Sequence, residues 1–105
     1  MRQAAPELEI DDDITGAELS REARPELRTA SKGAAELASR HLVMAGRLFD
    51  DDAELAYSHA RAARRLLPRL AVVREAVGLC AYANGEWAEA LGELRASRRI
   101  SGDVG

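Results

Sequence analysis

The sequence has few aromatic residues, one cysteine and no long apolar run, and each shortage excludes certain classes of protein. Aromatic residues make up 4% of the 105 positions, so Ala and Leu supply most of the apolar surface, and both favour helix. The single cysteine, Cys80, excludes an internal disulfide framework and a metal site built from several cysteines. No apolar run approaches the roughly 18 residues that a membrane span requires, and the first residues lack the apolar stretch of a signal peptide. We therefore expect one soluble, cytoplasmic domain that does not enter a membrane.

Charge is unevenly distributed along the chain. The 15 basic residues, against 18 acidic ones, give a net charge of −3, which argues against a dedicated nucleic-acid-binding protein. The first 20 residues contain Arg2 and six acids, which are Glu7, Glu9, Asp11, Asp12, Asp13 and Glu18. Because residues 1–14 also lack an apolar period, we expect them to form an acidic, mobile tail.

Helical periodicity begins near residue 15, and no alternating strand pattern competes with it. Thr15 and Glu18 have the spacing of a capping box, whereas Pro25 removes a backbone donor, so we expect a kinked or broken capping helix over 16–29. Four further helices are predicted over residues 31–49, 53–67, 69–84 and 86–100. Residues 15–104 are therefore expected to form a single all-α domain of about five helices.

The segments between the predicted helices carry specific boundary signals. The acidic run 50–52 should end one helix and supply the N-cap of the next, and Asn84-Gly85 is typical of a helix C-terminus. The helix over 69–84 has Arg74 and Glu75 as its only charged residues after its first turn, so we expect it to lie at the centre of the domain, covered on most sides. In the last helix, the residues expected to face inward are Trp87, Ala90, Leu91, Leu94 and Ile100.

An internal repeat with a period of 34 residues runs through residues 37–104. A shift of 34 positions superimposes the segment RAARRL at 61–66 on RASRRI at 95–100. Over the whole repeat the two copies share seven identities, where this composition would give roughly three or four by chance. The identical pairs are Arg40/Arg74, Val43/Val77, Ala56/Ala90, Arg61/Arg95, Ala62/Ala96, Arg64/Arg98 and Arg65/Arg99.

With these two units, at 37–70 and 71–104, the chain resembles the tetratricopeptide repeat, a 34-residue helix–turn–helix with small residues where helices cross. It is also similar to the short alanine- and arginine-rich repeat proteins of bacteria. The residues that match the family motif are Val77, Gly78, Gly85, Trp87, Ala90 and Leu94 in the second unit, and Ala56, Ala63 and Pro68 in the first. The departures from the motif are Met44, Asp51, Arg74, Ser97 and Gly102.

The resemblance implies a short α-solenoid of antiparallel helix pairs that binds other proteins. The first helix of each unit would line a concave groove that takes an extended or helical peptide. Carried over to this chain, the groove residues are His41, Ala45, Leu48, Glu75, Leu79 and Tyr82. These side chains are unsuited to clamp a carboxylate, so an apolar or mildly basic peptide is the implied ligand. Alternatively, the same surface packs only against the N-terminal segment.

The end of the array after Ile100 is a second candidate binding surface. Helical repeats usually need about three units or terminal caps, and two units are visible here. This end is therefore polar enough to remain exposed, contacts a protein partner or a second copy, or continues into a longer chain.

Two rows of arginines at i, i+3, i+4 favour a different function. The rows are Arg61, Arg64 and Arg65 on one predicted helix, and Arg95, Arg98 and Arg99 on another. On the convex face they could contact phosphates or an acidic partner, but no aromatic residues lie between them to stack on bases. A solvated face is therefore the preferred interpretation and a nucleic-acid-associated protein the alternative. The acidic tail could also fold onto these arginines.

Residues near the N-terminus match the spacing of a calcium loop, with glycine sixth and glutamate twelfth. These residues are Asp11, Asp13, Thr15, Gly16, Ala17, Leu19 and Glu22. Because Glu18 stands where a hydrophobic residue usually anchors such a loop, an acidic tail that runs into a capping box is the preferred interpretation.

No group of residues has the pattern of a catalytic site or a phosphate-binding loop, so we expect neither enzymatic activity nor a cofactor. His41 and His59 lie on different predicted helices without a third ligand at metal-binding spacing, so no metal site is expected. Cys80 and Trp87 are interpreted as core residues. Gly78 should lie where two helices approach closely.

Overall fold

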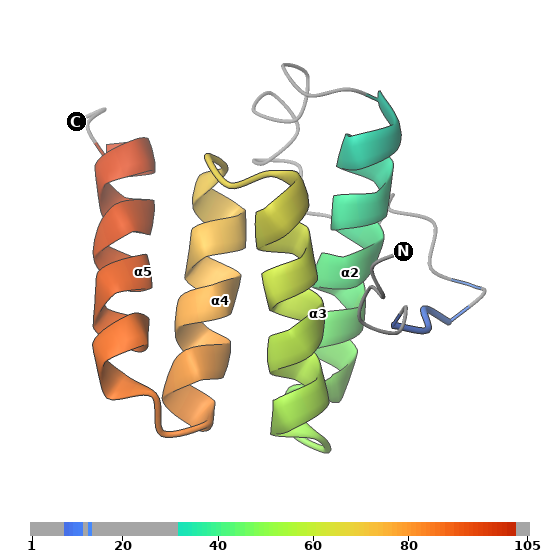
Figure 1. Cartoon of the computed structure of the whole chain (residues 1–105), viewed down its shortest axis with the longest axis horizontal. Coiled ribbons are helices and arrows are strands. Elements are labelled where there is room, and N and C mark those ends of the chain that lie inside the picture. Colours follow the sequence, from blue (N-terminus) through green and yellow to red (C-terminus); the bar gives the residue numbers. More distant parts are fainter. Residues whose placement is uncertain (1–7, 12, 14–31, 103–105) are drawn as a thin grey trace, which may run out of the picture.

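Four helices follow one another along the part of the chain that the computed structural model describes, which comprises residues 8–11, 13 and 32–102 (Figure 1). Their bounds are Lys32–Leu48 for α2, Ala53–Leu66 for α3, Ala71–Ala83 for α4 and Trp87–Ser101 for α5. The described residues contain no strand. This described part of the protein is therefore all-helical, and the four helices predicted from residue 31 onward are confirmed. The helix predicted over 16–29 lies outside the described residues.

Local signals account for where these helices begin and end. The Asp52 side chain accepts a hydrogen bond from the Leu55 backbone N–H at 3.1 Å, which caps α3 as predicted. At the end of α4, Gly85 has a φ of 79°, a left-handed conformation that glycine adopts without steric cost. The N–H of Glu86 then donates to the carbonyl of Ala81 at 2.8 Å, and that of Gly85 to Tyr82 at 3.0 Å. This pattern is a Schellman cap, which turns the chain sharply from α4 into α5.

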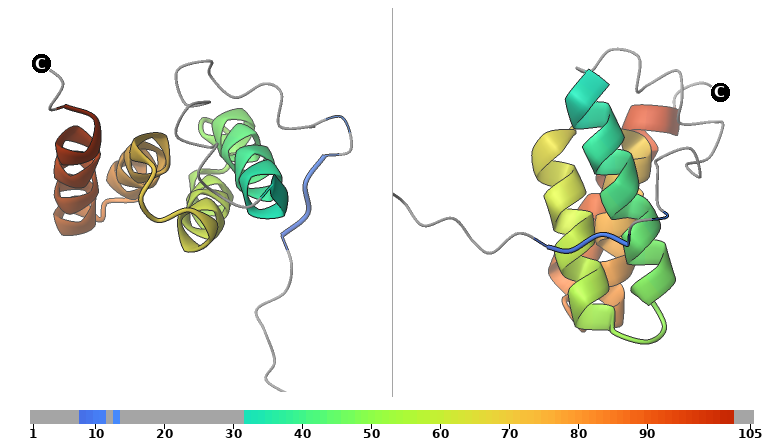
Figure 2. Two further views of the ribbon diagram at one scale, coloured as in Figure 1. Left: turned by 90° about the horizontal axis from the view of Figure 1, so that it is seen from above. Right: turned by 90° about the vertical axis from the view of Figure 1, so that its right-hand side faces the viewer.

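Consecutive helices run in opposite directions and lie in a row from α2 to α5 (Figure 1). Seen from above, α3 is displaced to one side of the line between α2 and α4 (Figure 2). The helices pack through small side chains: one core cluster joins α2, α3 and α4 to α5, and another joins α2, α3 and α4. The wholly buried alanines are Ala38, Ala56, Ala60, Ala63 and Ala81. Alanine at the crossings lets the helix backbones approach closely, which explains an apolar core with few large residues.

Gly78 lies where α4 and α5 approach closely, as predicted. A Cβ atom built on this glycine would lie 2.8 Å from Cγ of Leu94 and 3.3 Å from the backbone oxygen of Ala90. The contact with Leu94 is shorter than real Cβ atoms show, so a larger residue fits only if the Leu94 side chain or α5 moves.

The prediction that α5 turns its large apolar residues inward is wrong for three of five positions. Ala90 is buried and Leu94 half-buried, whereas Trp87, Leu91 and Ile100 are 61%, 51% and 40% exposed. The reason is that α5 packs mainly against one neighbour, α4, so only one side of the helix is covered. α4 lies inside the row, between α3 and α5, but one of its faces is open, and Leu79 and Tyr82 are exposed there.

Candidate functional site

An apolar hollow lies between α2 and α4, the two helices on the same side of the row. Its volume is about 320 Å³. Its lining consists entirely of apolar, glycine and cysteine side chains, namely Leu42, Ala45, Gly46, Phe49, Ala76, Leu79 and Cys80. Phe49 and Leu79 at its edges are 36% and 46% exposed. The hollow therefore offers an apolar ligand a surface without any charged group to desolvate.

Of the six groove residues that the resemblance implies, Ala45 and Leu79 line this hollow. Leu48 packs against the core beside it. Glu75 and Tyr82 are exposed outside the hollow, and Tyr82 contacts Trp87 edge-on with ring centroids 5.1 Å apart. His41 is buried and belongs to a different site. The hollow also uses Leu42 and Phe49, two large apolar residues that lie about one turn before and one turn after Ala45.

The two histidines form a buried pair between α2 and α3. Nδ1 of His41 and Nδ1 of His59 are 3.0 Å apart, and His59 is completely buried. A hydrogen bond at this distance requires one Nδ1 to carry the proton and the other to accept it. The Nε2 of His59 has no hydrogen-bond partner among the described residues. A buried polar atom without a partner is costly in either tautomer, and protonation of both rings would add buried charge and break the hydrogen bond between the two Nδ1 atoms.

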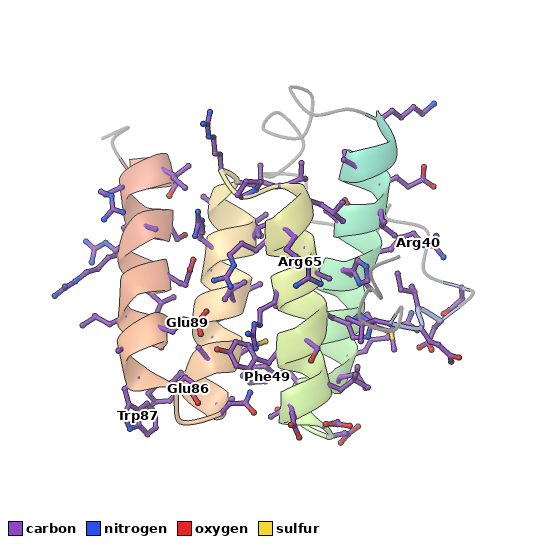
Figure 3. All side chains as sticks on the ribbon, viewed as in Figure 1. Arg40, Phe49, Arg65, Glu86, Trp87 and Glu89 are labelled. Carbon is purple, nitrogen blue, oxygen red and sulfur yellow. The ribbon has the colours of Figure 1, made fainter. Side chains whose placement is uncertain are left out.

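The surroundings of the pair favour neutral imidazoles. Burial, the His59 ring and the positive charges of Arg65 and Arg40 lower the pKa of His41 to about 4. Burial also lowers the pKa of His59, against a smaller opposing effect of Asp11. Figure 3 shows Arg65 on α3 and Arg40 on α2. No group of three or more metal-ligating side chains occurs among the residues that the structure describes.

A chain of ion pairs joins α3 to α5 across α4. Arg64 on α3 binds Glu89 at 2.9 Å and Glu93 at 2.7 Å, and Glu93 also binds Arg74 of α4 at 3.0 Å. The Tyr57 hydroxyl donates to Glu89 as well. Burial and this bond raise the pKa of Tyr57 to about 12, and the same bond and Arg64 hold the pKa of Glu89 below its usual value. Both acids of α5 are thereby turned toward α4 and α3, and Figure 3 shows Glu89 on that side.

The arginine rows therefore differ from a uniform basic face. Arg64 is engaged by two acids, and the guanidinium of Arg61 lies 4.6 Å from the centroid of the Tyr57 ring. Arg65 is exposed beside the histidine pair. On α5 the whole second row is exposed, and it comprises Arg95, Arg98 and Arg99. Nothing in the spacing of the arginines revealed this difference, because it depends on the two acids of α5.

Part of the N-terminal segment contacts α2. Arg47 binds Asp11 at 3.3 Å and Asp13 at 2.9 Å, and its guanidinium holds the pKa of Asp13 below the usual value. The described part of the acidic tail thus reaches an arginine outside the two predicted rows. The other residues of the calcium-loop pattern and the Thr15–Glu18 capping box lie outside the described residues.

Cys80 is buried in the floor of the hollow. Burial raises the pKa of its thiol to about 11, so the reactive thiolate is disfavoured at neutral pH.

No protein-family model, curated protein or solved structure matches the chain. Among the described helices, none combines the length and the apolar character needed to cross a membrane.

Proposed function

We propose that the protein is a non-enzymatic protein–protein interaction module that binds a peptide or a partner helix in the hollow between α2 and α4. The observation that carries this proposal is the composition of the hollow. Seven lining residues contribute no charge, and two large side chains at its edges are left exposed. An exposed apolar concavity on a small domain is a common property of protein-binding surfaces.

The resemblance to the tetratricopeptide repeat supports the same location. In that family the first helix of each unit lines the binding groove, and α2 and α4 fall in the first half of the two proposed units. Small residues at the crossings, such as Gly78 and Ala90, occupy the positions that the family motif assigns to close helix contacts. The fold is thus compatible with a short α-solenoid.

The alternative is a nucleic-acid-associated protein that uses the arginine rows. The three exposed arginines of α5 favour it, whereas the engagement of Arg64 by Glu89 and Glu93 and the net charge of −3 oppose it. Protein binding is the better-supported function.

A selection of peptides from a random library on the immobilised protein tests the proposal. Selected peptides should bind at least about tenfold more weakly to Leu79→Glu, which places a charge at the edge of the hollow, and to Gly46→Trp, which fills it. Leu37→Glu is the matched control, because Leu37 is 39% exposed but does not line the hollow. Peptides that bind all three variants equally would show that the hollow is not the binding site.

A further inference from the structure

The helix at the edge of the row, α5, has an outer surface that the described elements leave uncovered. α5 buries one residue, Ala90, whereas α2, α3 and α4 each bury six. Its helical contacts are mainly with α4. Figure 1 shows α5 at the end of the row opposite α2. The exposed side of α5 is therefore available to a partner.

The exposed residues of α5 form two adjacent stripes of mixed character. Trp87, Leu91, Arg95 and Arg98 follow at steps of four, four and three residues, so they lie along one side of the helix. The neighbouring stripe contains Ala88, Gly92 and Arg99. The first two turns thus present two large apolar side chains beside two small residues, and the last two turns present three arginines. Figure 3 shows Trp87 at the lower end of α5, on the outside of the molecule.

The ion pairs within the protein make this face positive. Glu89 and Glu93 are the only acids of α5, and Arg64 and Arg74 hold both of them on the opposite side. None of the exposed residues within Trp87–Ser101 is acidic. A ligand for this face must accordingly supply negative charge opposite the arginines and apolar side chains opposite Trp87 and Leu91.

We propose that the outer face of α5 binds an acidic amphipathic helix that runs antiparallel to α5. This inference rests on the proposed function as a protein-binding module and assigns it a second surface with a partner of defined chemistry. The arginines lie at the C-terminal end of α5, so in an antiparallel pair they meet the first turns of the partner. Acidic residues in those turns are also favoured by the partner's own helix dipole. The small residues Ala88 and Gly92 permit close helix contact.

The experiment uses a synthetic helical peptide without tryptophan, with three glutamates in its first two turns and leucines at i, i+3 and i+4 in its last two. Trp87 is the only tryptophan of the chain, so its fluorescence reports on this face directly. Titration of the peptide into the full-length protein should shift the emission of Trp87 to shorter wavelength, because the indole becomes buried. The apparent Kd should rise steeply with salt.

Two variants test the charge requirement. Arg95→Glu/Arg98→Glu/Arg99→Glu should weaken binding at least about tenfold, and a lysine-for-glutamate peptide should bind this variant better than the parent. The matched control Arg61→Glu/Arg65→Glu/Arg69→Glu changes three arginines outside α5 and should leave Kd within about twofold. Circular dichroism establishes that each variant is helical.

Three outcomes would overturn the proposal. The peptide fails to shift the emission; single-stranded DNA of 20 nucleotides shifts it where the peptide does not; or the emission shifts with protein concentration alone, which would assign the face to a second copy. If library-selected peptides still occupy the hollow in any of these cases, the proposed function survives and only this inference fails.

Discussion

At the scale of single residues, the histidine pair is the least expected feature of the structure. The sequence places His41 and His59 on different helices, but it cannot show that they meet. Their contact depends on the axial offset between α2 and α3, and the small side chains packed between these helices determine that offset. Two histidines that have no evident relation in the sequence thus form one buried pair in the structure.

The pair predicts a specific loss of stability in mild acid. Unfolded histidine titrates near pH 6.5, whereas the pKa of His41 in the folded protein is about 4. The unfolded chain therefore binds protons first, so the contribution of His41 is complete above pH 6.5 and is lost as the pH falls toward 4. We expect this loss to be on the order of 3 kcal/mol by pH 4, from about 1.4 kcal/mol per pKa unit between 6.5 and 4.

Urea unfolding at several pH values between 4 and 7 measures this effect. The double variant His41→Leu/His59→Leu keeps the apolar packing but removes both titrating rings, while Asp11, Arg40 and Arg65 stay in place. Its free energy of unfolding should fall less over this range than that of the parent. Parallel decreases in the two proteins would show that the pair does not control acid stability.

At the scale of helices, local signals specify the elements well. The predicted N-cap Asp52, the Asn84-Gly85 turn and the stop before Pro68 all lie at observed helix boundaries, because each acts on backbone groups within a few residues. Whether a side chain is buried depends less on its neighbours in the sequence than a helix boundary does. Trp87 and Leu91 have the spacing of an inward stripe, but no helix lies opposite them in the described fold.

The crossing of α4 and α5 provides the prediction at this scale. Gly78→Leu should lower the free energy of unfolding by about 3 kcal/mol, because even its Cβ would lie within 3 Å of the Leu94 side chain. Gly92→Leu is the control: it makes the same change within α5, where no atom lies within 4 Å of the new Cβ, and it should be neutral or stabilising. Equal unfolding midpoints for the two variants would exclude a close crossing at Gly78.

At the scale of the whole molecule, the buried residues are unevenly divided among the helices. Among the described helices, α3 and α4 each have a neighbour on both sides, and α2 and α5 have one. The two outer helices nevertheless differ, since α2 buries six residues and α5 buries one. The hollow could be located from sequence only in part, because two of its lining residues were predicted and the rest depend on the spacing of α2 and α4.

This unevenness predicts an order of local stability that hydrogen exchange can measure. Amides of α5 should exchange at least about tenfold faster than those of α3 and α4, because opening α5 exposes only one buried residue, Ala90. The ion pairs of Glu89 and Glu93 with α3 and α4 oppose this opening, so exchange in α5 should accelerate further in 1 M NaCl. α2 is the internal comparison, since it is also an outer helix but has six buried residues, and it should exchange more slowly than α5.

Equal protection of the α2 and α5 amides would contradict this order and would mean that the domain opens as one unit. Slower exchange of α5 with the acidic peptide bound would connect this edge helix to the surface proposed for it.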